Sequence, residues 1–304
     1  MSAVVAKIRR KRPESGGGRF AIALPYGWLV LFFLIPFLIV AVISFGESAI
    51  SIPPYTAPLE FGDDWTPQLD INLVNYARLF TDGLYIKAYL NSLELAGIAT
   101  AICLLIGYPM AYAIARADRR WRNLLLMMVV LPFWTSFLIR VYAWIGILKT
   151  NGLINNMLLA SGLISEPLPL LNNTFSVVLA LVYSYLPFMI LPLYATLERM
   201  DMSLLEAASD LGCRPFRAFL SVTLPLSLPG IAAGCLLVFI PMVGEFVIPD
   251  LLGGPDTLMI GKVLWDEFFT NHDWPVAASV AVVMLLLLIW PMGKIRRLLA
   301  KGMA

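Results

Sequence analysis

Long apolar runs separated by short polar segments dominate this chain. Six runs reach about the 20 residues that a helix needs to cross the hydrocarbon core of a bilayer. They are residues 21–45, 88–115, 123–148, 174–197, 229–249 and 276–293. The first run is too long and too interrupted by proline for a secretory signal and lacks a small-residue cleavage site, so we expect a permanent span. The pattern predicts an all-α integral membrane protein with six transmembrane helices.

Composition excludes a soluble globular protein. Of the 304 residues, 60% are hydrophobic and only 14% are charged, and the mean hydropathy is +0.81. So few polar side chains cannot cover the surface of a soluble domain of this length. We therefore expect a multi-pass membrane location.

Lys and Arg gather on one side of the predicted spans. They precede the first span, join the second to the third, lie between the fourth and fifth, and follow the sixth. Cytoplasmic loops carry this excess, so both termini are expected in the cytoplasm. The opposite segments hold most of the acidic residues, which would concentrate a cationic solute. The preference of basic residues for cytoplasmic loops would also leave the opposite segments poor in Lys and Arg, whether or not the solute is a cation.

The polar segment between the fourth and fifth spans carries a distinct motif. Glu206-Ala207-Ala208 is followed by Gly212 and then by Leu224-Pro225. Ser203 and Glu206 have the spacing of a capping box that would start a short helix. Gly212 is suited to the left-handed conformation that ends it.

A second short helix is expected to follow this glycine. Pro215 suits its first turn, and Phe216, Phe219 and Leu220 are expected on one face. Two interpretations of the segment remain open. Glu206 either only caps its helix, or the segment also docks this apolar face into a groove on a partner protein.

Three ionisable residues lie inside the predicted spans, where charge is costly unless it faces protein or water. Glu94 shares a helix face with small residues and is expected to face the bundle. Arg140 is expected either to pair with Glu94 or Glu245, or to leave Glu245 free to attract a cationic substrate. Tyr142 or Trp144 would then offer an aromatic face to the cation. Proline and glycine around Glu245 predict a break in that helix, and such breaks commonly line cavities.

Chemistry within the chain itself is sparse. Gly261-Lys262-Val263 lacks the upstream glycine and the hydroxyl residue of a phosphate-binding loop. The chain has one histidine and three cysteines, none at metal-ligand spacing, and it has no recognisable hydrolase motif. We therefore expect no catalytic residues, no metal and no bound cofactor, and any ATP hydrolysis must occur on another chain. An intramembrane enzyme is disfavoured, and a partner-docking segment argues against a passive channel.

The motif around Glu206 resembles the cytoplasmic coupling loop of permease subunits of ATP-driven importers. Residues 132–144, 243–249 and 251–256 resemble the permeases of bacterial spermidine and putrescine importers, in particular those that form the first permease subunit of a putrescine system. Cys213 and Val222 depart from the usual alanine and isoleucine of that loop. Both changes are small and compatible with docking.

This resemblance implies a fold, a set of partners and a location. The fold is the type I ABC importer permease fold, and the location is the bacterial inner membrane. The partners are a second homologous permease subunit, an ATPase dimer that binds ATP and Mg²⁺, and a periplasmic polyamine-binding protein. The residues expected to couple to the ATPase are Glu206, Ala207, Ala208, Gly212, Pro215, Phe216 and Phe219. The residues expected along the substrate pathway are Glu94, Arg140, Tyr142, Trp144 and Glu245.

The expected organisation follows from these assignments. It comprises a basic cytoplasmic tail (1–20), a first transmembrane helix with a periplasmic segment (21–87), a transmembrane domain (88–294) containing the coupling loop (198–228), and a second tail (295–304). The expected function is import of putrescine, spermidine or both by alternating access. Import of another small solute, such as an amino acid or an anion, is the alternative within the transporter class.

Overall fold

The computed structural model describes residues 16–302, apart from residues 57, 62–66 and 70. Most of the predicted basic tail lies outside the described residues. The helices are α1 (Gly16–Leu29), α2 (Ile35–Ile43), α3 (Val74–Thr81), α4 (Gly83–Arg116), α5 (Arg119–Val130), α6 (Phe137–Leu148), α7 (Leu153–Ala160), α8 (Thr174–Glu198), α9 (Ser203–Asp210), α10 (Pro215–Ala218), α11 (Leu224–Val243), α12 (Val247–Leu252), α13 (Ile260–Trp265) and α14 (Trp274–Gly302). Short 3₁₀ turns cover Leu131–Trp134 and Pro255–Thr257, and π-helical turns cover Val30–Leu34, Phe219–Thr223 and Asp266–Thr270.

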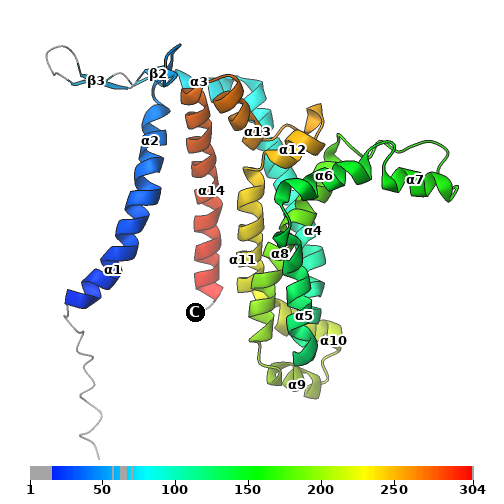
Figure 1. Ribbon diagram of the computed structural model, residues 1–304. Helices are drawn as coiled ribbons and strands as arrows, with labels where there is room; N and C mark the ends of the chain where they lie inside the picture. Colours follow the sequence, from blue (N-terminus) through cyan, green and yellow to red (C-terminus); the bar gives the residue numbers. More distant parts are fainter. Residues whose placement is uncertain (1–15, 57, 62–66, 70, 303–304) are drawn as a thin grey trace, which may run out of the picture.

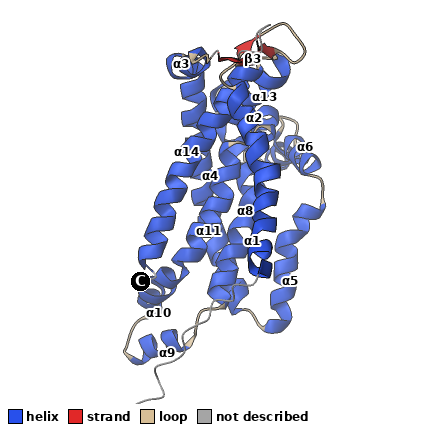
Figure 2. Cartoon of the chain, turned by 90° about the vertical axis from the view of Figure 1, so that its left-hand side faces the viewer, coloured by secondary structure: helices blue, strands red, loops and turns tan. Residues whose placement is uncertain are grey.

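Two antiparallel hairpins add a small amount of strand between the first two spans. β1 (Glu47–Ser48) pairs with β2 (Tyr55–Thr56), and β3 (Leu59–Phe61) pairs with β4 (Pro67–Leu69). They lie at the end of the molecule opposite α9 and α10 (Figure 2). The predicted all-α class therefore holds for the membrane region.

The centre of the fold is the packing of α4, α8 and α11, which run side by side with α14 alongside α11 (Figure 1). Small residues allow the backbones to approach. A Cβ on Gly234 of α11 would come within 2.8 Å of the Met189 sulfur of α8, and one on Gly107 of α4 would lie 3.1 Å from Met189 Cγ. Close approach at glycine is the usual way in which membrane helices gain packing contacts. Tyr108 and Ser227 add a buried hydrogen bond of 2.9 Å between α4 and α11.

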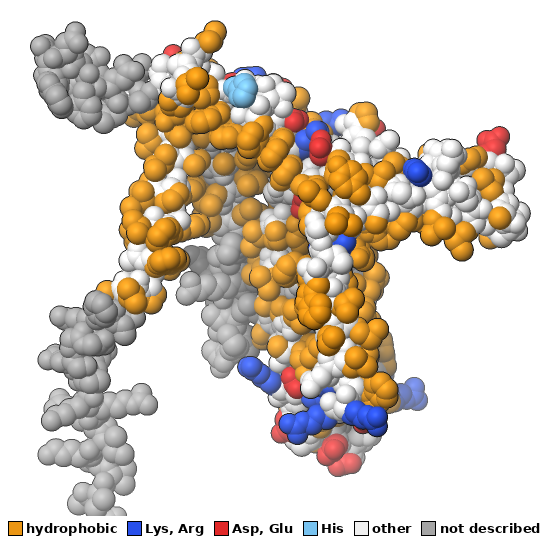
Figure 3. Space-filling model, in the orientation of Figure 1, with side chains coloured by type: hydrophobic (Ala, Val, Ile, Leu, Met, Phe, Trp, Pro, Cys, Tyr) orange, Lys and Arg blue, Asp and Glu red, His pale blue; other side chains and the backbone are white. Residues whose placement is uncertain are grey.

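Several predicted spans appear as helices of membrane length. Helical stretches long and apolar enough to cross a bilayer cover Ala23–Ile43, Gly83–Arg116, Thr174–Glu198 and Pro215–Val243, with a shorter apolar helix at Trp274–Ile289. Phe137–Ala160 also has the length and composition, but it consists of α6 and α7 with a turn between them. Lys and Arg side chains gather around the end that carries α9 and α10, while hydrophobic side chains cover most of the described surface above it (Figure 3). That end is the one predicted to be cytoplasmic. The exact count of six spans and the orientation stay predictions.

The third span was expected as one continuous helix over residues 123–148, and this prediction is wrong. α5 ends at Val130, a 3₁₀ turn follows, and Thr135 and Ser136 are extended before α6 starts. Pro132 lacks an amide hydrogen and cannot sit in a helix interior without losing a hydrogen bond. α6 then turns away from the bundle axis, and α7 follows it after a turn at residues 149–152 (Figure 1).

The fifth predicted span starts and ends differently from a helix over residues 229–249. Its apolar helix begins at Pro215, because α10, a π-helical turn and α11 follow one another without a gap. The expected break near Glu245 is confirmed, since α11 ends at Val243 and α12 starts at Val247. Residues 244–246 therefore form a short non-helical joint toward the end of the bundle opposite α9 and α10 (Figure 1).

Candidate functional site

The loop between α8 and α11 has the backbone geometry that its glycine predicts. Gly212 has φ +77°, which lies in the left-handed region that glycine adopts at little cost. The Cys213 amide donates to Ala208 O at 3.0 Å and the Gly212 amide to Ser209 O at 2.8 Å. This is the hydrogen-bond pattern of a Schellman motif, which satisfies the last carbonyls of α9. Pro215 then occupies the first turn of α10, as predicted.

The predicted capping box is wrong. Ser203 is the first residue of α9 rather than its cap. Its amide donates to Asp201 Oδ1 at 3.0 Å, and the Glu206 amide donates to Met202 O at 3.1 Å. Asp201 lies two residues before Ser203, so its carboxylate reaches the exposed amide instead. These hydrogen bonds from the backbone amide and hydroxyl of Ser203 lower the pKa of Asp201. Glu206 is exposed and does not cap α9.

The apolar residues of this loop do not share one exposed face, contrary to the prediction. Phe216 is 72% exposed. Phe219 instead packs edge-on against Tyr108 and Tyr112 of α4, with ring centres 5.6 and 6.3 Å apart. The ring of Phe219 therefore points toward the bundle, whereas Phe216 and Leu220 stay exposed. Leu211, which was not among the predicted coupling residues, is 89% exposed beside Gly212.

Glu245 occupies the joint between α11 and α12 and is only 8% exposed. Its Oε2 accepts a hydrogen bond of 2.6 Å from the Tyr185 hydroxyl of α8. Its Oε1 accepts one of 3.1 Å from the Val247 amide, the first of α12. Among the described residues no Lys or Arg pairs with this carboxylate. The site is thus a buried acid held by one phenol and one amide.

Of the two alternatives for Arg140, the ion pair with Glu94 or Glu245 does not form among the described residues. The Arg140 guanidinium instead lies 5.4 Å from the ring centre of Phe133 and 5.7 Å from that of Phe137. Arg140 is on α6, and the break before α6 brings Phe133 beneath it. Cation–π contact therefore replaces the expected salt bridge within the described part of the chain.

Glu94 does not face the bundle, which corrects another prediction. Leu95 and Ala99 form the buried side of α4, whereas Glu94 and Ala101 are exposed. A Cβ added to Gly97 would meet nothing within 4 Å. The face of α4 that carries Glu94, Gly97 and Ala101 was expected to contact other helices. In this chain no other helix covers it among the described residues.

Aromatic rings connect the surroundings of Glu245 with those of Arg140. Tyr185 lies 6.1 Å from Phe188, and Phe188 lies 5.0 Å from Phe133, measured between ring centres. We call Tyr185, Phe188 and Phe133 the aromatic row. Sequence reasoning missed it and proposed Trp144 and Tyr142 instead. Trp144 packs edge-on against Tyr183 at 5.4 Å, and Tyr142 is exposed.

The signal that pointed to this row was present but weak. Two tyrosines, at 183 and 185, interrupt an otherwise apolar run, and a buried tyrosine hydroxyl usually has a partner. The identity of that partner depends on how α8 packs against α11, which no local pattern encodes.

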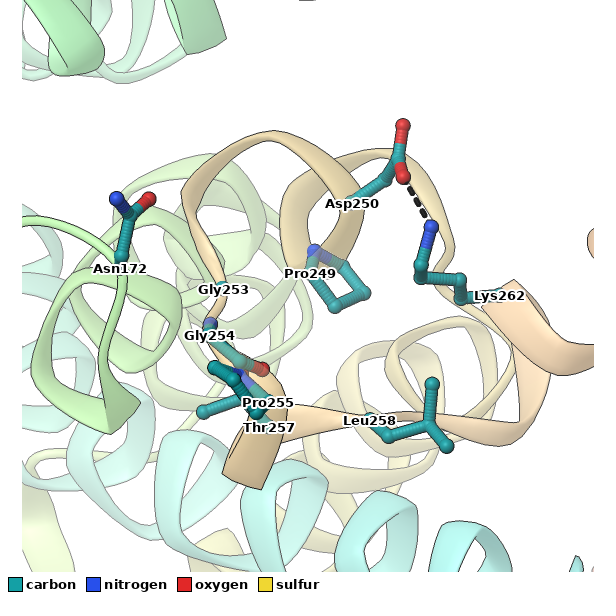
Figure 4. Close-up of a pocket in the computed structure, with 9 residues that line it drawn as sticks. All are labelled: Asn172, Pro249, Asp250, Gly253, Gly254, Pro255, Thr257, Leu258 and Lys262. Atoms are coloured by element: carbon teal, nitrogen blue, oxygen red, sulfur yellow. Dashed lines mark hydrogen bonds and ion pairs between the residues drawn. The ribbon is translucent and has the colours of Figure 1, made fainter. Parts of the chain in front are cut away.

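An open pocket lies beside the joint, at the end of the bundle opposite α9 and α10 (Figure 4). It has a volume of about 500 Å³ and is lined by Asn172, Pro249, Asp250, Gly253, Gly254, Pro255, Thr257, Leu258 and Lys262. Asp250 and Lys262 point toward each other on one side, and Asn172 lies on the other. Partial burial opposes the charge of Lys262, but its ion pairs with Asp250 and Asp266 outweigh this, so the pKa of Lys262 is raised. Its amine is 3.7 Å from Asp266 Oδ2.

Comparison with known proteins identifies the family. Residues 103–303 match the family described as "Binding-protein-dependent transport system inner membrane component". The chain belongs to this family. The match covers α8, the loop with Gly212, the joint at Glu245 and the pocket beside it.

Curated relatives cover nearly the whole chain. It is 42% identical over 288 residues to the "Spermidine/putrescine transport system permease protein PotB" of Haemophilus influenzae, covering 92% of this chain and 94% of that protein. It is 40% identical over 262 residues to the protein of the same name from Escherichia coli (strain K12), covering 86% of this chain and 90% of that one. These relatives confirm the resemblance to spermidine and putrescine permeases.

Solved structures support the fold. A bacterial ABC transporter involved in the import of the acidic polysaccharide alginate matches with a TM-score of 0.61 and 20% identity, covering 92% of this chain and 96% of that chain. Identity at this level supports the ABC permease fold and says nothing of the solute. The protein is thus an inner-membrane permease of the ABC transporter class.

Proposed function

We propose that this chain is a permease subunit of an ATP-driven importer that moves putrescine, spermidine or both into the cytoplasm by alternating access. The PotB relatives support the solute class through their names. The observation that carries the proposal within this chain is the buried Glu245 carboxylate, which has no basic partner among the described residues.

A polyamine matches the chemistry around this carboxylate. Its ammonium groups would compensate the charge of Glu245, and a charge at membrane depth is costly until it is compensated. Its remaining ammonium and methylene groups would contact the aromatic row, because ring faces attract cations. Arg140 lies at the far end of the row, over Phe133. The positive guanidinium would repel an ammonium there and favour binding near Glu245.

The uncovered side of α4 supports a second permease subunit as a partner. Glu94 is exposed in this chain, and lipid is an unfavourable environment for a carboxylate. A homologous subunit packed on the face that includes Gly97 and Ala101 would remove Glu94 from lipid. The solute pathway would then run between the two subunits, with Glu94 and Glu245 both accessible to it.

The loop at the opposite end suits an ATPase partner. Glu206, Gly212 and Phe216 lie in a protruding segment between α8 and α11. An ATPase dimer that binds ATP and Mg²⁺ would receive Phe216 and Leu211 in a groove. Movement of α9 and α10 would pass to α11, since α10 continues into it. A periplasmic polyamine-binding protein would deliver the solute at the outer face.

Uptake of labelled putrescine and spermidine tests this proposal. The host cells lack their own polyamine importers. They express the second permease subunit, the ATPase and the binding protein, with or without this subunit. We expect uptake to depend on the subunit. Absence of dependence, with the ATPase still retained in mild detergent, would refute the polyamine assignment and favour another small solute.

The Glu245→Gln variant tests the proposed site. We expect it to raise the KM for uptake at least tenfold while assembly with the ATPase is retained, because the amide cannot compensate an ammonium charge. Glu166→Gln is the matched control, since Glu166 is an exposed acid in the segment between α7 and α8. An unchanged KM for Glu245→Gln would remove Glu245 from the pathway.

A further inference from the structure

The first turn of α13 lies directly on the joint that carries Glu245. A Cβ on Gly261 would come within 2.4 Å of the Gly244 carbonyl oxygen and 2.6 Å of the Glu245 carbonyl oxygen. These are backbone atoms, so any side chain at 261 would have to displace the joint itself. Gly261 has no positive φ. Position 261 therefore requires glycine because α13 and the joint approach each other closely there, and not because of its backbone conformation.

A second contact joins α13 to the same short segment. The ring of Phe246 stacks on that of Trp265, with centres 4.4 Å apart and planes 9° from parallel. Gly261 and Trp265 are one helical turn apart on α13, so one side of this helix covers residues 244–246. Within the joint, the Glu245 amide donates to Met242 O at 3.2 Å and Phe246 O accepts from the Asp250 amide at 3.0 Å. The contacts of Gly261 and Trp265 add to these bonds, so α13 fixes the joint from a second direction.

The position of α13 is in turn set by α4. The Ile260 amide donates to Ser92 Oγ at 2.7 Å in a buried hydrogen bond. Asn91 donates to the carbonyl oxygens of Asp256 and Leu258 at 3.2 and 3.4 Å. The entry to α13 is therefore anchored to a long helix of the bundle. The backbone of Glu245 is held from the outer side by α13, and its carboxylate is held from the inner side by Tyr185.

We propose that Gly261 and Tyr185 are positioning residues for solute recognition, which fix the Glu245 carboxylate where the ammonium of the solute binds. This inference rests on the proposed role of Glu245. Gly261 acts through the backbone, because it lets α13 approach the two carbonyls. Tyr185 acts through its hydroxyl, which donates to one oxygen of the Glu245 carboxylate and so fixes the orientation of that carboxylate. Gly261 does not contact the solute, and the hydroxyl of Tyr185 acts through Glu245. Tyr185→Phe keeps the ring that belongs to the aromatic row, so it removes the positioning hydrogen bond alone.

A double-mutant cycle with Glu245→Gln tests this proposal. In the otherwise unchanged importer, Tyr185→Phe is expected to raise the KM for putrescine about tenfold, the change typical of losing one hydrogen bond to a charged group. Gly261→Ala is expected to raise it by at least as much, with little change in the maximal rate for the assembled complex. In the Glu245→Gln background, both substitutions are expected to change KM less than twofold. A purely structural role would lower assembly or the maximal rate to the same extent in both backgrounds.

Two control variants separate positioning from general stability. Tyr89→Phe removes a buried tyrosine hydrogen bond of 2.8 Å to Val280 O, without contact to Glu245. Gly83→Ala adds a methyl group at the start of α4, where nothing lies within 4 Å. Both are expected to leave the KM unchanged. Tyr185→Phe removes only the hydroxyl oxygen and is expected to leave assembly intact. This variant therefore decides the test if the importer with Gly261→Ala does not assemble.

The outcomes distinguish the two levels of the proposal. If Glu245→Gln raises the KM but Tyr185→Phe does not, or if its effect persists fully in the Glu245→Gln background, the positioning inference is overturned and the role of Glu245 stands. If Glu245→Gln leaves the KM unchanged, the role of Glu245 fails and the inference fails with it. Loss of the Tyr185→Phe effect only in the Glu245→Gln background would support both.

Discussion

Replacing Gly212 by alanine tests the backbone geometry of the loop between α8 and α11 without adding charge. The φ of +77° places this residue in the left-handed region. A Cβ there would meet nothing within 4 Å, so alanine would not clash with any neighbour. The whole effect of the substitution should therefore come from the conformational preference of an L-residue.

The expected magnitude follows from that preference. A non-glycine residue pays roughly 1–2 kcal/mol to adopt the left-handed conformation. An energy of this size lowers the population of a given local geometry by about 5–30-fold. The Schellman hydrogen bonds that end α9 depend on this geometry. We expect Gly212→Ala to misdirect the chain between α9 and α10 and to reduce coupled uptake by about tenfold.

Three measurements check this prediction. They are the amount of subunit in the membrane, retention of the ATPase in mild detergent, and uptake of labelled putrescine. Membrane insertion should be unchanged, because the loop lies outside the spans. Gly212→Asn should restore much of the uptake, because asparagine adopts the left-handed region more readily than alanine.

Gly162 provides a matched control on the other side of the molecule. It has φ +70°, and a Cβ added there would also meet nothing within 4 Å, so alanine carries a similar conformational cost. It follows α7, far from the loop with Gly212 (Figure 1). Normal uptake by Gly212→Ala, or an equal loss with Gly162→Ala, would refute the reasoning.

Three further substitutions have defined expectations. Gly234→Leu should lower the thermal stability of the detergent-solubilised complex by several degrees, because its side chain would overlap the Met189 sulfur; Gly27→Leu, with nothing within 4 Å, should not. Glu198→Gln removes the charge from the 2.8 Å ion pair with Arg122 and leaves the hydrogen bonds of Arg122 to Ala115 O and Ala117 O in place. The midpoint of a denaturant titration should hardly change, since such partly exposed pairs are weak; a large shift of the midpoint would contradict this. Phe216→Ser should leave insertion intact but reduce ATPase retention at least tenfold, as expected for an aromatic anchor; full retention would exclude Phe216 from the dock.

The sequence by itself determined the features that depend on neighbouring residues. Apolar length indicated the membrane-crossing helices, and the residues around Glu245 predicted the break that separates α11 from α12. The left-handed Gly212 followed in the same way, since only the residue and its flanking helices are involved. These outcomes follow from local rules, because hydrogen bonding within a helix and backbone sterics act over a few residues.

Only the tertiary structure decided which distant groups meet. Tyr185 and Glu245 are 60 residues apart, and the aromatic row joins α8 to the turn before α6. The outward direction of Glu94 was equally hidden, because small residues suit either a contact within the chain or one with a partner. Side-chain pairing is set by the rotation and crossing of packed helices, and a uniformly apolar segment does not encode that rotation locally.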